Sequence, residues 1–242
     1  MEQSRATLSL TENVFVCVVD RHAVFLDLGR DDYSAIPLRP AADIEHANDA
    51  AVAELLAHEL DLHRADLLSA GLISQSSSGA GRLVDFLSLP RATGHLLGRD
   101  DARCFGFSTL RPNRPNVGVL DVVSFYWACW KASQLLRRRH ISRIAARVRR
   151  RKARSPAALQ VDELRRQLLI FRRLRPWYPR SYLCLWDALA LLEFLARRRL
   201  FPEWVFGVQV EPFGAHCWLQ TGDKVINDDT EYAQQFTPIM AI

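Results

Sequence analysis

The chain has 242 residues, which is enough for one large domain or two small ones, each with its own core. Hydrophobic residues make up 49% of the chain and charged residues 24%, a balance that excludes a disordered protein. The formal net charge is +5, and the basic excess is local rather than spread along the chain.

The sequence shows no targeting or membrane-spanning segment. Residues 1–11 are polar and lack the apolar stretch and small-residue cleavage site of a secretion signal. The longest apolar stretch, 117–130, is too short to span a bilayer and contains Asp121 and Ser124. We therefore expect a soluble cytoplasmic protein that has no membrane partner.

The cysteines are few and scattered. There are five, at positions 17, 104, 129, 184 and 217, with wide spacings and no C-x-x-C pair. An odd number at such spacings argues against a disulfide framework and against a zinc knuckle. We expect most of them to be small buried side chains and one to be a nucleophile.

Strand-forming residues open the chain. Residues 13–19, 23–28 and 33–36 are rich in β-branched and aromatic side chains and are separated by short polar turns. This pattern predicts a three-stranded antiparallel meander.

Two helices are expected after these strands. Apolar residues recur at helical spacing from Asp49 to about Leu60, and 63–70 predicts a shorter helix that stops at Gly71. Three strands followed by helices make a small winged-helix-like unit at residues 1–80.

A second domain follows a flexible boundary. The polar, glycine-rich stretch 74–81 predicts this boundary, so we expect a linker at 81–94 and a second domain at 95–242. The overall fold class is then α+β. In the second domain we expect helices at 121–136, 161–173 and 182–199, and strands at 204–210, 215–220 and 224–227.

A dense basic run occupies residues 137–154. A solvated helical face explains it most simply. Contact with nucleic acid and a docking surface for a partner enzyme or an acidic peptide are the alternatives. The aromatic residues 125–127 and Trp130 are expected in the core rather than on a stacking platform.

Cys184 is the candidate nucleophile. It lies in the first turn of the predicted helix 182–199, for which Ser181 is the candidate N-cap. The positive end of a helix dipole lowers the pKa of a thiol, and the thiolate is the species that attacks.

His216 and Asp228 are the candidate partners of this thiol. His216 starts one predicted strand and Asp228 ends the next, and a hairpin centred on Gly222 would bring the two together. The imidazole would take the thiol proton, and the carboxylate would orient the imidazole. Asp229 competes for this role but should face the opposite side of the strand.

Two further points concern the same residues. Cys217 should point away from His216 and pack in the core. Cys184, His216 and Asp228 could instead be three ligands of a metal, but the sequence offers no fourth ligand or second thiolate.

The order of these residues resembles papain-like and transglutaminase-like enzymes, and more narrowly the leader peptidase of lasso-peptide biosynthesis, the B protein. The resemblance rests on the segments 182–185, 214–218 and 225–228 and on Gly222, and Cys217 replaces the usual small residue. It implies a cysteine peptidase that removes the leader of a ribosomally made precursor peptide, with the triad Cys184, His216 and Asp228. It implies neither a metal nor an organic cofactor.

The N-terminal unit resembles the other half of such B proteins, a leader-recognition domain related to PqqD. In that family the leader peptide adds a strand to the edge of the sheet. The resemblance implies that Tyr33, Ser34, Ala35 and Ile36 form the receiving edge and that Leu67 belongs to the groove wall. It also implies a second partner, an ATP-dependent macrocyclase resembling asparagine synthetase.

Two other functions remain open from the sequence. A transglutaminase or amidase would use the same triad and pass the acyl group to an amine. A winged-helix regulator that binds nucleic acid is the least favoured reading, because it gives no reason for the arrangement of Cys184, His216 and Asp228.

Overall fold

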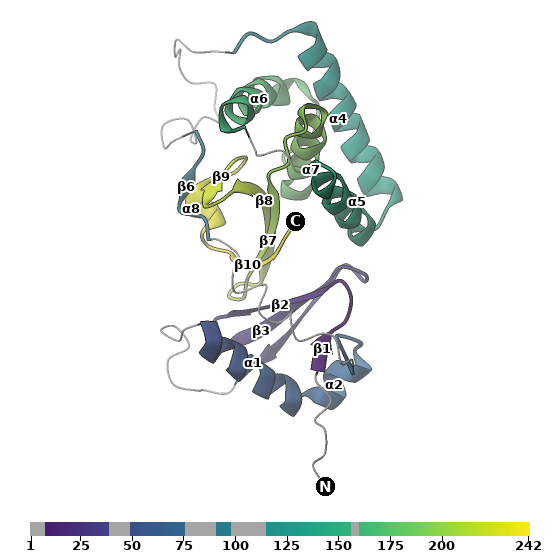
Figure 1. Ribbon diagram of the computed structural model, residues 1–242, viewed down its shortest axis with the longest axis vertical. Coiled ribbons are helices and arrows are strands. Elements are labelled where there is room, and N and C mark those ends of the chain that lie inside the picture. The colour runs from purple at the N-terminus through teal and green to yellow at the C-terminus, as the bar shows by residue number, and fades with distance from the viewer. Residues whose placement is uncertain (1–7, 39–48, 76–90, 98–114, 156–159) are drawn as a thin grey trace. The chain divides into compact units, whose positions relative to one another are not determined.

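The computed structural model describes residues 8–38, 49–75, 91–97, 115–155 and 160–242 (Figure 1). These residues fall into two compact units, one built chiefly from the residues up to Gln75 and one chiefly from those after Pro90. Both units combine helices with strands, so the α+β class is confirmed. Most of the predicted linker at 81–94 lies outside the described residues. Cys104 also lies outside them.

The first unit contains the predicted three-stranded meander. Strands β2 (Val14–Val19), β3 (His22–Asp27) and β4 (Asp32–Pro37) form an antiparallel sheet in the order β2-β3-β4. The turn between β2 and β3 has positive φ at both Asp20 and Arg21, which is the conformation that two-residue hairpins favour. The predicted three-stranded sheet is therefore confirmed.

Two helices and a second strand pair complete the first unit. Helix α1 (Asp49–Leu62) is followed by α2 (Arg64–Ser69), and Gly71, with φ of 72°, lies just beyond the end of α2 as predicted. Strands β1 (Leu8–Leu10) and β5 (Ile73–Gln75) pair antiparallel, which the sequence did not indicate. The winged-helix assignment stays a prediction.

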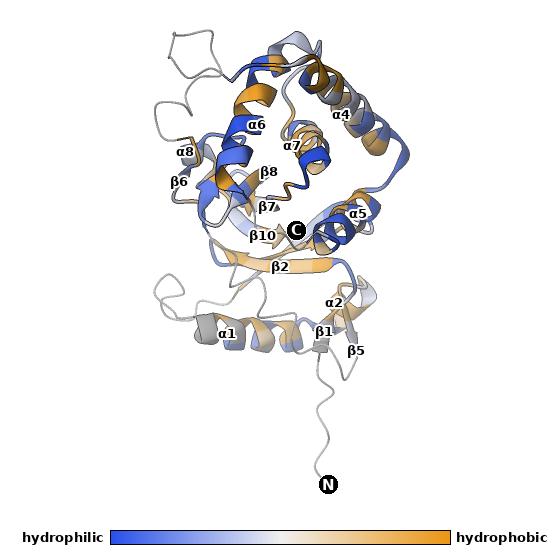
Figure 2. Ribbon diagram, turned by 45° about the horizontal axis from the view of Figure 1, so that its top comes forward, coloured by the Kyte–Doolittle hydropathy of each residue, from blue (hydrophilic) through white to orange (hydrophobic). Residues whose placement is uncertain are grey.

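The core of the first unit forms between the meander and the helices. Val16 and Phe25 from the sheet pack in one cluster with Leu56 and Leu60 from α1 and Leu67 from α2. The hydropathy colouring of Figure 2 shows β2 as hydrophobic along its length, in keeping with a strand that supports this core.

Four longer helices build one side of the second unit. They are α4 (Val119–Arg138), α5 (Ile141–Ala153), α6 (Val161–Leu174) and α7 (Cys184–Leu195), with short 3₁₀ turns η2 (Arg175–Trp177) and η3 (Ala196–Arg198). In Figures 1 and 2, α7 lies between α4 and β8. Its buried side chains include Trp186, Leu189 and Phe194, so α7 is the central helix of this core.

A mixed sheet builds the other side, although its residues 207–209, 214–215 and 237–240 are grouped with the first unit. Its strands are β6 (Gly94–His95), β7 (Glu203–Gln209), β8 (Gly214–Thr221), β9 (Lys224–Val225) and β10 (Thr237–Ala241), in the order β10-β7-β8-β9-β6. The predicted hairpin is present: Thr221 pairs with Lys224, and Gly222 takes a positive φ of 56° between them. A short helix, α8 (Thr230–Ala233), follows β9.

One prediction about α4 is wrong. Phe125 is buried as expected, but Tyr126, Trp127 and Trp130 are 42%, 39% and 56% exposed. Helical periodicity places Phe125 on the side that meets Phe171 of α6 and turns the other three outward. None of the described helices is both long and apolar enough to cross a membrane.

Candidate active site

Helix α7 begins at Cys184 itself. The preceding residue, Leu183, is the N-cap and has no capping side chain, so the expected cap at Ser181 is wrong. The carboxylate of Asp187 instead accepts the backbone N–H of Leu183 at 2.8 Å and closes the first turn. The exposed thiol of Cys184 therefore lies at the positive end of the helix.

A buried arginine fixes the chain that enters α7. Arg175 is 4% exposed and forms an ion pair with Asp187, which includes an Nη2–Oδ2 contact of 3.3 Å. Its guanidinium also donates to the carbonyl oxygens of Arg180, at 3.1 and 3.2 Å, and of Ser181, at 3.3 Å. The guanidinium of Arg175 therefore fixes both the segment just before Cys184 and, through Asp187, the first turn of α7. The sequence analysis missed this pair.

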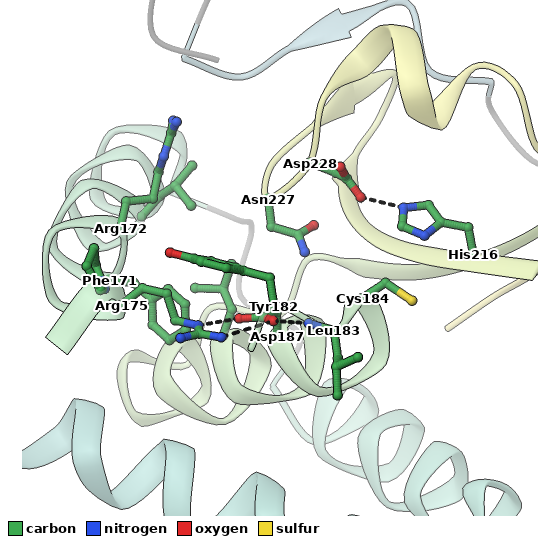
Figure 3. A pocket seen from close by; sticks show the side chains of 13 residues that line it. Phe171, Arg172, Arg175, Tyr182, Leu183, Cys184, Asp187, His216, Asn227 and Asp228 are labelled. Atoms are coloured by element: carbon green, nitrogen blue, oxygen red, sulfur yellow. Dashed lines mark hydrogen bonds and ion pairs between the residues drawn. The ribbon is translucent and has the colours of Figure 1, made fainter. Parts of the chain in front are cut away.

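His216 and Asp228 meet as the predicted hairpin requires. His216 is in β8, and its Nε2 atom is hydrogen-bonded to Oδ2 of Asp228 (Figure 3). The imidazole is buried and packs near the rings of Trp218, Tyr232 and Phe236, with centroid distances of 5.9, 4.9 and 5.0 Å. This aromatic surround limits water around the ring, which strengthens its charge interactions.

The two neighbouring aspartates have different partners. Asp228 accepts the backbone N–H of Asp229 at 2.8 Å with the oxygen that does not bond His216. Asp229 instead caps α8, since its carboxylate accepts the N–H groups of Glu231 at 2.7 Å and Tyr232 at 3.3 Å. Only Asp228 is therefore placed to orient the imidazole.

Asn227 holds the aspartate in position. Its Oδ1 atom accepts the backbone N–H of Leu219 at 2.6 Å, which ties the segment after β9 to β8. Asp228, the next residue, is thereby kept beside the strand that carries His216. Asn227 also lines the pocket in Figure 3, a role that the sequence analysis did not assign to it.

The surroundings favour the charged forms of both Cys184 and His216. Hydrogen bonds with Cys217 and His216 lower the pKa of the Cys184 thiol to about 4, against a smaller opposing effect of burial. Burial lowers the pKa of His216, but hydrogen bonds and attraction to Asp228 and Cys184 raise it to about 9. Between these values the site holds a thiolate beside an imidazolium.

Cys217 is a near neighbour of the thiolate. It is buried, as expected for a core cysteine, but its interaction with Cys184 also lowers the pKa of that thiol, which was not predicted. That interaction and burial raise the pKa of Cys217 well above its usual value. Cys217 therefore stays protonated and can donate its S–H to the thiolate of Cys184.

These residues line a pocket of about 550 Å³, the size of many ligand pockets (Figure 3). One end is polar and contains Cys184, His216, Asn227 and Asp228. The rest of the wall combines apolar residues, among them Leu168, Phe171 and Leu191, with the charged residues Arg172, Arg175 and Asp187 (Figure 3). The thiol thus opens into a cavity that can hold a side chain of a substrate next to the reacting group.

The residues expected to bind a leader peptide belong to the first unit. Residues 33–36 form most of β4, which pairs only with β3 in the described part of the chain and so lies at a sheet edge. Leu67 is 3% exposed and packs in the core, so it supports the unit from within rather than lining a surface. Among the described residues, no group of three or more His, Cys, Asp or Glu side chains could hold a metal ion.

Comparison with protein families supports the class of fold that the geometry indicates. Residues 127–241 match the model of the transglutaminase-like superfamily, so this part of the chain is a transglutaminase-like domain. The matched segment includes Cys184, His216 and Asp228. Comparison with curated proteins gives no match, and comparison with solved structures gives none either.

Proposed function

We propose that the protein is a cysteine peptidase that binds a ribosomally made lasso-peptide precursor and removes its leader before macrocyclisation. The observation behind this proposal is the exposed thiol of Cys184, which starts a helix and shares a pocket with the bonded pair His216–Asp228. A transglutaminase-like domain is compatible with peptide hydrolysis and with acyl transfer. The narrower assignment rests on the resemblance of the segments around these three residues to the lasso-peptide leader peptidase.

The first chemical step is attack by the thiolate. Sulfur of Cys184 bonds to the carbonyl carbon at the end of the leader, and the carbonyl oxygen takes the negative charge. The backbone N–H of Cys184, in the first turn of α7, has no acceptor within the helix and suits this oxyanion. The imidazolium of His216 then gives its proton to the leaving nitrogen, which frees the amine of the core peptide and leaves a thioester.

The second step releases the leader. His216, now neutral, takes a proton from a water molecule as that water attacks the thioester carbon. Collapse of the intermediate returns the thiolate of Cys184 and frees the leader with a carboxylic acid end. Asp228 stays ionised throughout, since its role is to orient the ring and to stabilise the imidazolium.

Recognition of the precursor is assigned to the first unit. Strand β4, which includes residues 33–36, offers a sheet edge to which an extended leader can add a strand. The freed amine would then pass to an ATP-dependent macrocyclase resembling asparagine synthetase, the second expected partner. The proposed peptide chemistry uses side chains and the backbone of this chain together with one water molecule.

The test is mass spectrometry of a synthetic lasso-peptide precursor incubated with wild type and with the Cys184→Ala variant, with and without a macrocyclase and ATP. The proposal expects wild type to release a leader whose mass includes one added water. The Cys184→Ala variant should bind the peptide and leave it intact.

Two results would contradict parts of the proposal in different ways. If Cys184→Ala cleaved the precursor at the wild-type rate, Cys184 would not be the nucleophile and the proposed triad would be wrong. If the leader were joined to an added amine, such as glycinamide, in preference to water, the same residues would catalyse acyl transfer rather than hydrolysis.

A further inference from the structure

Helix α5 has a cationic face opposite its buried face. Its core-facing residues are Ile141, Ile144, Ala145 and Val148. Arginines recur every three or four residues along the other side, at 139, 143, 147, 150 and 154, where the first and last flank the helix. Figure 2 shows hydrophilic residues in blue and hydrophobic residues in orange side by side along α5.

These arginines line a hollow rather than a ridge. The hollow has a volume of about 530 Å³ and is lined by Arg139, Arg143, Arg147, Arg150, Arg151, Arg154 and Ala146. Its lining contains neither a carboxylate nor an aromatic ring. We refer to it as the arginine groove. Its size is that of a ligand pocket, which suits a single peptide segment.

The charge of the groove is only partly balanced. Glu193 of α7, 1% exposed, pairs with Lys131 at 2.6 Å, Arg151 at 2.8 Å and Arg147 at 3.8 Å, so one carboxylate serves three cations. Within the part of the chain that the structure describes, no carboxylate forms an ion pair with the groove residues 139, 143, 150 and 154. Like charges one helical turn apart repel, and a bound anion would relieve that repulsion.

An exposed apolar stripe on α4 is linked to the groove through Glu193, which pairs with Lys131 of α4 and with Arg147 and Arg151 of the groove. Lys131, which pairs with Glu193, also lies 4.3 Å from the ring centroid of Trp127 on α4. Trp127, Trp130 and Val123 share one side of α4, and Trp130 and Val123 are 56% and 58% exposed. Exposed apolar patches mark protein or membrane interaction sites, whereas a free phosphate or a nucleic-acid backbone makes no use of them.

We propose that the arginine groove docks an acidic segment of a protein partner, whose apolar residues lie on Trp127 and Trp130. The guanidinium groups offer paired donors that match carboxylates. Helix α5, which carries most of the groove, has 13 residues and a length of about 20 Å, which matches an extended segment of about six residues. The site is separate from the pocket at Cys184 and does not depend on the proposed peptidase activity.

The test measures binding of fluorescein-labelled hexaglutamate by anisotropy at low salt. The groove variant is Arg143→Gln/Arg150→Gln/Arg154→Gln, which leaves Arg147 and Arg151 in place to balance Glu193. The matched control, Arg165→Gln/Arg166→Gln/Arg173→Gln, removes the same charge from exposed positions of α6. The proposal expects the Kd to rise by about tenfold or more in the groove variant and by less than about twofold in the control.

A second probe tests the apolar stripe. A labelled peptide that alternates glutamate with leucine should bind more tightly than hexaglutamate, and Trp130→Ala should remove that gain. Equal losses in the groove variant and the control, or no binding of either peptide to wild type, would overturn the proposal. So would tighter binding of duplex DNA or of phosphatidylglycerol vesicles that the groove variant abolishes, since the partner would then not be a protein.

Discussion

The Nε2 atom of His216 is hydrogen-bonded to Oδ2 of Asp228, while the adjacent Asp229 directs its carboxylate to the first turn of α8. Two aspartates that are neighbours in sequence therefore have different structural roles. One supports the charge of the imidazole, and the other caps a helix. This difference gives the site a matched pair of positions for testing the role of Asp228.

We predict that Asp228→Asn lowers kcat/KM for leader cleavage by about 10²- to 10⁴-fold. Loss of the negative charge lowers the pKa of His216 and weakens the imidazolium that stabilises the Cys184 thiolate. Asp229→Asn should stay within a few-fold of wild type, because the amide oxygen still caps α8. If the two variants lost activity to the same extent, Asp228 would have no special role.

We predict that Cys217→Ala raises the pKa of Cys184, because the variant lacks the S–H donor to the thiolate. The rate of alkylation of Cys184 at pH 5 should fall, by about tenfold for each unit by which the pKa rises above 5. Cys217→Ser, which keeps a donor, should restore most of that rate. Cys129→Ala removes another buried thiol and serves as the control for packing loss; a fall as large as that of Cys217→Ala would count against the donor role.

We predict that Arg175→Gln lowers both stability and activity. It leaves the carboxylate of Asp187 without its buried partner, which should cost roughly 3 kcal/mol in the free energy of unfolding. The chain before Cys184 also loses the donors that fix it. Urea unfolding measures the first effect, and the double variant Arg175→Gln/Asp187→Asn should recover part of the loss. Additive losses in the double variant would argue against a coupled pair.

The dependence of activity on pH follows from the two shifted groups. Below about pH 4 the Cys184 thiolate becomes protonated, and above about pH 9 the His216 imidazolium loses the proton that the leaving amine needs. We predict a bell-shaped profile of kcat/KM for leader cleavage with limbs near these values. A profile that keeps rising through pH 9 would indicate an ordinary thiol instead.

The local patterns of the sequence were sufficient for the meander, the main helices and the hairpin at Gly222. β-branched runs separated by turns gave strands β2 to β4, and apolar periodicity gave α4, α6 and α7. The pairing of β1 with β5 was missed because each strand has three residues and the two are far apart in the chain. Such short strands leave no periodic signal.

At the site, tertiary contacts decided what the sequence could not. Ser181 had the features of an N-cap, but Arg175 takes its carbonyl and Asp187 caps the helix, so α7 starts at Cys184. Strand alternation predicts that Cys217 points away from His216, but it does not predict the interaction of Cys217 with Cys184. The order of Cys184, His216 and Asp228 was readable because a helix start and a tight hairpin are local features.

The central claim is that Cys184 is a thiolate paired with the His216 imidazolium, and its most direct test is the rate of iodoacetamide alkylation of Cys184 against pH, followed by peptide mass mapping. The account predicts a rate that is half-maximal near pH 4, nearly flat from about pH 5 to 8, and abolished at this position in Cys184→Ala. A rate that rises about tenfold per pH unit up to pH 8 or above, as for an unperturbed thiol, would contradict it.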